Sequence, residues 1–291
     1  MSHAFERLAR EEEDENIKKL ADEKSVAMLA IIAPHVPYRI SPRRVVYVEL
    51  GTPEEFGIET FILKAKERGI RKLYMLLHSP GGGVSSAYVI AKALRKNFDD
   101  ITVFIPQLAA SGATLIAIAA NRIVMGEISR VSPIDVLIWE DEGMKSALSL
   151  VKSFARLESR FERTPLEDIS YPYRHLIESI KPEELERMHG VLTEVESYAH
   201  ELLKMANYEE NKAKEIAETL VYGFHIHFEV VSYERLREMG LNVVWYEDRR
   251  EEWDIMRYWL GKYILEENPI HHIVYVFPSE GGISNEAGEG D

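Results

Sequence analysis

No cysteine occurs among the 291 residues of this chain. Disulfide bonds, thiol catalysis and cysteine-ligated metal sites are therefore excluded. Long hydrophobic runs are also missing, because the best apolar run near the N-terminus, residues 26–33, is far shorter than the roughly 20 residues of a membrane-spanning helix. No signal peptide is recognisable there either. We therefore expect a soluble, cytoplasmic protein that does not insert into a membrane.

Positive charge is scarce relative to negative charge. Lys and Arg number 35 against 49 Asp and Glu, which gives a formal net charge of -14. A nucleic-acid surface needs clustered basic residues, so we expect no nucleic-acid partner. The acidic excess is explained most simply by solubility. Hydrophobic residues make up 46% of the chain, an ordinary value that predicts a sizeable core.

Strands and helices are expected to alternate over residues 44–125. Runs rich in β-branched and aromatic residues predict strands, and the segments between them have helical spacing. This order predicts an α/β fold with a parallel sheet. At the start of the first helix, Thr52 is expected to cap and Glu55 to reach back. The expected strands are 44–50, 72–77, 101–106, 122–125, 241–246 and 273–277, and the expected helices are 52–68, 85–97, 111–120, 145–163, 182–220, 234–239 and 252–265.

The chain is expected to divide into three parts. The charged segment 5–29 predicts a surface helix within an N-terminal helical extension, residues 1–40. Residues 41–278 are expected to form one catalytic domain that includes a helical appendage. The tail, residues 279–291, is rich in Gly, Glu, Ser and Asn and is expected to be disordered.

Two short motifs lie where expected strands end. The first, Ser79–Gly83 (Ser-Pro-Gly-Gly-Gly), is a glycine-rich turn after the strand 72–77. The second, Ala109–Gly112 (Ala-Ala-Ser-Gly), follows the strand 101–106 and places Ser111 at the start of a helix. Ligands of α/β folds gather at this edge of the sheet. Glycine amides can donate to a developing oxyanion and a helix N-terminus favours an alkoxide, so the pair predicts an acyl-transfer site.

Either motif alone has a simpler explanation. A triple glycine is usually a tight turn, and a serine that opens a helix is usually an N-cap. Their position on successive strand ends of one α/β unit favours the catalytic interpretation. The turn lacks both the Gly-Lys-Ser/Thr of a P-loop and the G-x-G-x-x-G of a dinucleotide site. We therefore expect no cofactor.

Together with Ser132–Asp135 (Ser-Pro-Ile-Asp), these motifs resemble the ClpP-like and signal-peptide-peptidase-like serine proteases. The serine dehydrogenase proteinase family is especially similar, over about residues 45–137 and again over 220–243. The resemblance implies a ClpP/crotonase-type fold, a spiral of ββα units. It also implies a homo-oligomer, because proteins with this fold commonly assemble as rings, trimers or hexamers.

The resemblance assigns roles to individual residues. Ser111 would be the nucleophile, and Gly82 and Gly112 would supply the oxyanion-hole amides. The ClpP branch places a histidine base after the strand that follows the nucleophile helix, where this chain has residues 134–136 (Ile-Asp-Val). The signal-peptide-peptidase branch uses a lysine from a later helix, and Lys152, 41 positions after Ser111 (152 − 111), is similar to it. A lysine can act as a base where burial disfavours its charge.

Several other side chains are open candidates for supporting roles. Lys145 and Lys181 are alternative bases. His78 precedes the glycine turn and is expected to order that loop. Asp135 either orients the base or caps a turn, and we favour the cap.

Four further histidines lie in the C-terminal part. His225 and His227 alternate along an expected extended run, residues 224–231, and should face the same side. A pair without a nearby third ligand is a weak metal signal, so we expect no metal site. His227 also matches a position of the resembled family, where it either lies near the site or supports the structure. His271 and His272 are expected at the surface.

Three functions remain open. The first is an ATP-independent serine peptidase acting on peptides or unfolded protein segments. The second is a crotonase-type enzyme that uses the same amides on an acyl-CoA thioester, although Ser111 would then have no role and no basic cluster is visible for the CoA phosphates. The third is a non-catalytic assembly protein with a ClpP-like fold. We favour the peptidase because it uses both motifs.

Overall fold

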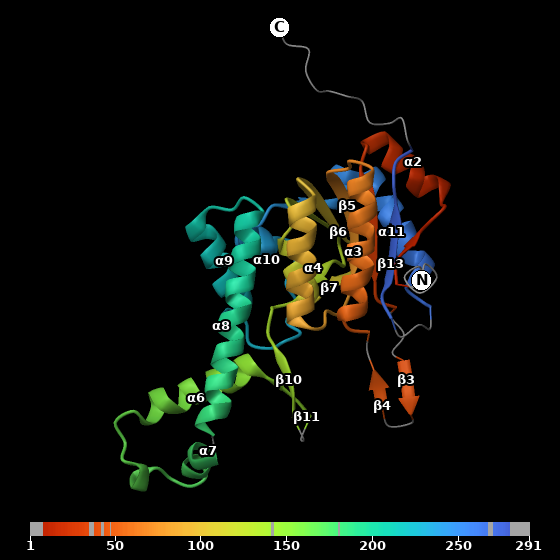
Figure 1. Ribbon diagram of the computed structural model, residues 1–291. Coiled ribbons are helices and arrows are strands. Elements are labelled where there is room, and N and C mark those ends of the chain that lie inside the picture. Colours follow the sequence, from red (N-terminus) through yellow and green to blue (C-terminus); the bar gives the residue numbers. More distant parts are fainter. Residues whose placement is uncertain are drawn as a thin grey trace.

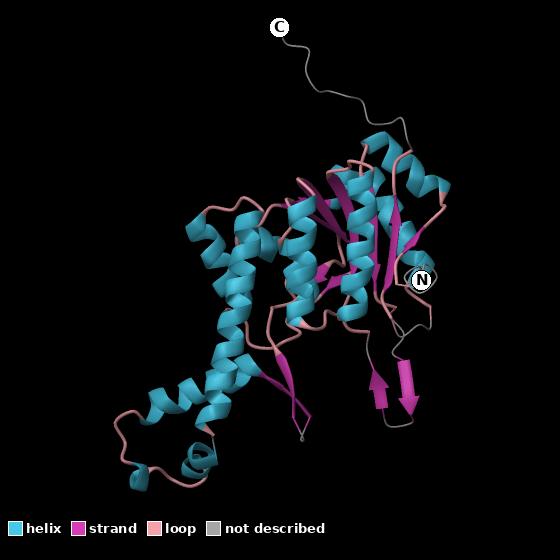
Figure 2. Ribbon diagram, viewed as in Figure 1, coloured by secondary structure: helices cyan, strands magenta, loops and turns pink. Residues whose placement is uncertain are grey.

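The computed structural model describes residues 8–34, 38–41, 44–46, 48–140, 143–179, 181–266 and 270–279. Within these ranges a seven-stranded sheet carries helices on both faces (Figures 1 and 2). Of the predicted disordered tail, everything from residue 280 onward lies outside the described residues. None of the helices in the described ranges is both long and apolar enough to cross a bilayer.

The sheet is mixed rather than purely parallel. Five neighbouring strands run in one direction, and two strands at one edge run in the opposite direction. In order across the sheet they are β1 (Arg10–Glu11), β13 (His272–Val276), β2 (Ala27–Ile32), β5 (Lys72–His78), β6 (Asp100–Ile105), β8 (Arg122–Met125) and β12 (Val243–Trp245). Three two-stranded pairs accompany it: β3 (Tyr38–Ser41) with β4 (Arg44–Val46), β7 (Leu108–Ala109) with β9 (Arg130–Val131), and β10 (Leu137–Glu140) with β11 (Gly143–Ser146).

Helices cover the sheet in two layers (Figure 1). One face carries α3 (Thr52–Glu67), α4 (Val84–Asn97), α5 (Gly112–Ile118), α8 (Pro182–Met205) and α9 (Glu210–Tyr222). The other face carries α2 (Glu15–Lys24) and α11 (Arg250–Tyr263). Helices α6 (Ala147–Phe161) and α7 (Tyr173–Ser179) lie beside one end of α8, away from the sheet (Figure 1). The short helices are η1 (Leu166–Asp168), α10 (Tyr233–Glu238) and η2 (Tyr246–Arg249).

The central strands are buried on both faces. In β5, Leu73, Met75 and Leu77 pack into the core under α3 and α4. The alternate residues, Tyr74 and Leu76, pack into the second core under α2 and α11. Because successive side chains of a strand point to opposite faces, a strand between two helical layers needs apolar residues at nearly every position. The continuous apolar runs of this sequence satisfy that need.

The helix predicted over residues 5–29 was wrong at both ends, because within the described residues it covers only Glu15–Lys24, and Arg10–Glu11 before it form strand β1. Helix α2 ends at Lys24, and Ser25 follows in the left-handed conformation with φ 51°. Ala27–Ile32 is strand β2, which is paired on both sides within the sheet. A six-residue apolar run fits a helix or a strand equally well by pattern alone, and pairing with β5 decides it. The segment predicted as a helical extension therefore supplies two strands, β1 and β2, to the sheet.

Helix α3 begins at residue 52 as predicted, but the predicted cap was wrong. The N-cap is Gly51, and the carboxylate of Glu54, not that of Glu55, accepts a hydrogen bond from the Gly51 amide at 2.8 Å. The predicted N-cap was one residue too late. A capping box pairs the N-cap with the residue three positions further on, so an N-cap at Gly51 instead of Thr52 makes Glu54 the partner instead of Glu55.

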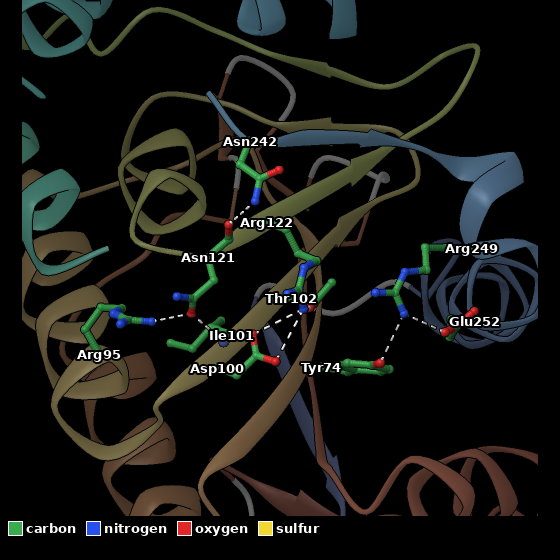
Figure 3. Close-up of polar contacts among 10 residues, drawn as sticks. All are labelled: Tyr74, Arg95, Asp100, Ile101, Thr102, Asn121, Arg122, Asn242, Arg249 and Glu252. Atoms are coloured by element: carbon green, nitrogen blue, oxygen red, sulfur yellow. Dashed lines mark hydrogen bonds and ion pairs between the residues drawn. The ribbon is translucent and has the colours of Figure 1, made fainter. Parts of the chain in front are cut away.

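Polar contacts fix the end of the sheet opposite to the two motifs (Figure 3). The Asn121 side-chain oxygen accepts hydrogen bonds from the Arg95 guanidinium at 2.6 Å and from the Ile101 amide at 2.8 Å. The Asn121 carbonyl accepts from the Asn242 side chain at 2.7 Å. One asparagine thus joins α4, the start of β6 and the segment before β12.

Replacement of Asn121 by alanine should lower the free energy of unfolding by about 1–3 kcal/mol, because the partly buried Arg95 guanidinium and Ile101 amide lose their acceptor. Urea unfolding measures this value. Asn97→Ala is the matched control, since the Asn97 side chain donates only to the Ala93 carbonyl of its own helix among the described residues, and it should cost less than about 0.5 kcal/mol. An equal loss in both variants contradicts the assignment.

Candidate functional site

Ser111 lies at the junction between β7 and helix α5, as predicted. It is the N-cap residue of α5 and has φ 52° and ψ −118°. Positive φ is unfavourable for any residue with a Cβ and persists only where the surroundings fix the backbone. They do so here: the Ser111 amide donates to the Ser132 hydroxyl at 2.8 Å, and its carbonyl accepts from the Leu115 amide at 3.2 Å. Backbone strain held in this way is a mark of functional residues.

The glycine turn and the serine are in direct contact. A Cβ built on Gly81 would lie 2.5 Å from the Ala110 carbonyl oxygen and 2.9 Å from the Ser111 Cβ. Gly81 has φ 101° and Gly82 has φ 146°, conformations that favour glycine. Ser79 and Ala109 form a parallel bridge that aligns the two segments. The two motifs found in the sequence therefore form one site.

Two amides of this junction are left out of its internal hydrogen bonds. A Cβ built on Gly112 would lie 3.5 Å from the Gly82 nitrogen, so the backbones of Gly82 and Gly112 adjoin. The neighbouring amides are all used: Gly81 donates to the Ser79 hydroxyl, Gly83 to the Leu50 carbonyl, Ser111 to the Ser132 hydroxyl and Ala113 to the Ala110 carbonyl. Among the described residues, no acceptor takes the amides of Gly82 and Gly112, which are the two predicted oxyanion donors.

The Ser111 hydroxyl has no hydrogen-bond partner within the described part of the chain, and the residue is 7% exposed. Ser132 was quoted in the sequence motif, but its role was missed. Its hydroxyl accepts from the Ser111 amide, while its carbonyl accepts from the hydroxyl of Thr114 at 2.9 Å. The Ser-Pro-Ile-Asp motif contains Ser132, but only the fold shows that its hydroxyl lies against the Ser111 amide.

Lys152 lies on α6 and is partly buried. Its amine donates to the carbonyl oxygens of Tyr222 at 2.6 Å and Phe224 at 2.5 Å, where helix α9 ends. The Leu148 amide, which lies one helical turn before Lys152 on α6, donates to a carboxylate oxygen of Asp135 at 3.1 Å. No hydrogen bond joins the Lys152 amine to Ser111 among the described residues.

Asp135 and His227 form a second buried pair. The Nδ1 atom of His227 lies 3.7 Å from the Asp135 carboxylate, and the side chains are 9% and 1% exposed. Asp135 also accepts from the amide of Leu148 in the first turn of α6, a helix whose N-cap is Ser146. His78 is buried at the end of β5, directly before the glycine motif.

Two predictions about the other histidines were wrong. Residues 224–231 form a turn-containing loop, so His225 is exposed whereas His227 is buried. His271 and His272 are 3% and 9% exposed rather than at the surface. They lead into β13, which is an internal strand between β1 and β2. Their polar character misled the prediction, because it gave no sign of the partners that the fold provides.

The fold and the site define an α/β protein with a serine set against unused glycine amides at the edge of a sheet. A family model described as ClpP-like SDH-type serine proteinase matches residues 63–279. The chain therefore belongs to this family. The match confirms the resemblance found in the motifs and the predicted ClpP/crotonase-type α/β fold.

Individual relatives cover part of the chain. Two uncharacterized proteins of Methanocaldococcus jannaschii, MJ0137 and MJ1495, are each 31% identical, over 169 and 171 residues. Each match covers 58% of this chain and 52% or 51% of the relative, so the chain spans about half the length of these relatives. Among solved structures, a variant of the 1510-N membrane-bound stomatin-specific protease in complex with a substrate peptide is similar with a TM-score of 0.45 and 13% identity, over 70% of this chain and 74% of that chain.

Proposed function

We propose that this chain is a serine peptidase in which the Ser111 hydroxyl attacks the carbonyl carbon of a peptide bond. The amides of Gly82 and Gly112 would donate to the oxyanion of the tetrahedral intermediate. The observation that supports this function most is that these two adjoining amides are the ones left unused beside Ser111. Donors that are already oriented need no reorganisation when the charge develops, so their effect on the barrier is large.

We propose Lys152 as the general base. A neutral lysine amine has two N–H donors and one lone pair, and the two carbonyls at the end of α9 accept from both donors. The lone pair then points away from these carbonyls and can take a proton from a hydroxyl. Fixing the amine by two backbone acceptors also reduces the rotamer freedom that a long side chain would otherwise have.

His227 is a second candidate for the base, and its contact with Asp135 supports it. A base oriented by a carboxylate is the arrangement of serine–histidine–aspartate hydrolases. The pair is buried, with His227 Nδ1 facing the carboxylate, which leaves Nε2 as the atom that would take the proton. The two candidates make different predictions for single variants.

Lys152→Ala should lower kcat/KM by at least about 10²-fold, the lower limit for a general base. Hydrolysis of a quenched fluorescent peptide library measures the activity, and a fluorophosphonate probe measures the reactivity of Ser111. Arg156→Ala is the matched control, because Arg156 is an exposed cation one turn further along α6. A loss below about threefold in Lys152→Ala, with a large loss in His227→Ala, transfers the role of base to His227.

The same probe separates the remaining functions. An unlabelled wild-type protein that binds acyl-CoA tightly would be a crotonase-type enzyme, in which the two amides hold a thioester oxygen. An unlabelled protein without such binding would be a non-catalytic assembly protein. Action on peptides or unfolded segments, assembly into a homo-oligomeric ring and a cytoplasmic location stay predictions from the sequence.

A further inference from the structure

A buried side-chain network lies beneath the glycine turn, away from the proposed nucleophile. Ser79 is 0% exposed, and its hydroxyl oxygen lies 2.8 Å from Nε2 of His271, which is 192 positions away in the sequence. Nδ1 of His271 lies 3.4 Å from the Glu54 carboxylate. Glu54 is buried in the first turn of α3. The order serine, histidine, glutamate resembles a catalytic triad, but the serine is closed to solvent and already shares its hydroxyl.

The network forms a closed ring with the backbone of the turn. The Ser79 oxygen accepts from the Gly81 amide at 3.0 Å, and the Gly81 carbonyl accepts from the Leu50 amide at 2.8 Å. The next residue, Gly51, donates its amide to the other carboxylate oxygen of Glu54 at 2.8 Å. The turn that carries the Gly82 amide is therefore held by hydrogen bonds on two sides. One side leads through Ser79 to His271, and the other leads through the backbone at residues 50–51 and Glu54 to His271.

One protonation pattern agrees with the contacts of the ring, in which His271 Nδ1 faces the Glu54 carboxylate as an ion-pair contact and not as a hydrogen bond. With the proton on Nδ1 facing Glu54, the Nε2 lone pair of His271 accepts from the Ser79 hydroxyl. The Ser79 oxygen keeps its lone pairs for the Gly81 amide. Burial raises the pKa of Glu54, but the contact with His271 and the Gly51 amide outweigh it, so the pKa lies below its ordinary value. Glu54 is thus an anion that orients the imidazole.

We infer that His271 is a positioning residue for the oxyanion donor Gly82: through Ser79 and Glu54 it fixes the glycine turn, a role that rests on the proposed function. Glycines have wide backbone freedom, so this turn keeps its shape only where its neighbours hold it. Without His271 the Ser79 hydroxyl can rotate away, and the Gly81 amide loses its acceptor. A displacement of about 1 Å at a reacting centre costs up to about 10²-fold in rate.

The first test needs no catalytic activity. Hydrogen exchange of a peptide covering residues 79–84 should become about tenfold faster in His271→Ala, because a lost acceptor releases the Gly81 amide. His272→Ala is the matched control: this adjacent histidine is similarly buried but contacts Glu266 at 3.2 Å, not the turn, and should leave that peptide unchanged. Ser79→Ala removes a single oxygen and should reproduce the faster exchange even if His271→Ala folds poorly.

The second test measures turnover of the peptide library. His271→Ala should lower kcat by about 10- to 10²-fold, with KM within about twofold, because substrate contacts remain while the oxyanion donor moves. His271→Gln retains a polar atom near the Nε2 position and should recover most of kcat. Equal exchange in His271→Ala and His272→Ala, or no recovery with glutamine, overturns the inference. If wild-type Ser111 is not labelled by a fluorophosphonate, the proposed peptidase function fails, and the exchange test alone decides the network.

Discussion

Ser111→Ala is expected to abolish peptide hydrolysis and fluorophosphonate labelling while leaving the fold intact. Loss of the nucleophile lowers kcat in a serine hydrolase by on the order of 10⁶-fold, which places the variant below detection. Folding stability should change little, because the hydroxyl has no partner within the described residues and alanine retains the amide that donates to Ser132. Peptide turnover, intact mass after labelling and a thermal melt measure the three quantities.

Ser111→Gly is the informative companion variant. Ser111 has φ 52°, a conformation that costs a residue with a Cβ about 1–3 kcal/mol but is open to glycine. Glycine also adds entropy to the unfolded chain, worth about 0.4–1 kcal/mol, which offsets part of the gain. The net expectation is a variant that has no activity and melts at or slightly above the wild-type temperature.

These two variants also define the result that would overturn the assignment. If Ser111→Ala keeps its labelling on the same peptide, another residue is the nucleophile. If Ser111→Gly is strongly destabilised, the backbone at this position is not strained, and the structural sign of a functional serine is lost. Ser149→Ala is the matched control, because Ser149 is an exposed serine on α6. Its replacement should change neither the labelling nor the melting temperature.

The sequence predicted those elements whose pattern is local and long. Helices α3 and α4 and strands β5, β6 and β8 lie within two residues of their expected bounds. Strand β2 could not be predicted, because its six apolar residues follow directly on a helix and only pairing with β5 and β13 identifies it. The antiparallel direction of β13 is likewise decided by long-range pairing.

The same distinction applies to the site. Ser111 and the glycine turn could be named because they lie in short motifs at strand ends, and the family resemblance singled out Gly82 and Gly112 as the oxyanion donors. His271 could not, since its partners are Ser79, 192 positions away, and Glu54. Polar residues on a chain give no sign of which buried acceptor the fold will bring to them, so supporting networks remain invisible until the tertiary structure is known.

Gly82 is the position where a single added methyl group should have the largest structural effect. A Cβ at Gly82 would lie 2.1 Å from the Leu50 nitrogen and 2.7 Å from the Leu50 oxygen. Both are backbone atoms within the bridge between Leu50 and the turn, so they cannot yield without breaking it. Gly82 also has φ 146°, which adds backbone strain of about 1–3 kcal/mol for alanine.

Gly82→Ala should therefore lose at least about 10²–10³-fold in kcat, the cost of one oxyanion donor, and should also lower the melting temperature. Gly83→Ala is the control next to it: φ is −54° there, and an added Cβ would lie 3.4 Å from the Leu50 oxygen, so activity and melting should stay close to wild type. Comparison of the two variants shows whether activity depends on the position of the Gly82 amide or is lost with any side chain in the turn. If Gly82→Ala turns over substrate as fast as Gly83→Ala, the oxyanion that forms at Ser111 must be stabilised by other donors.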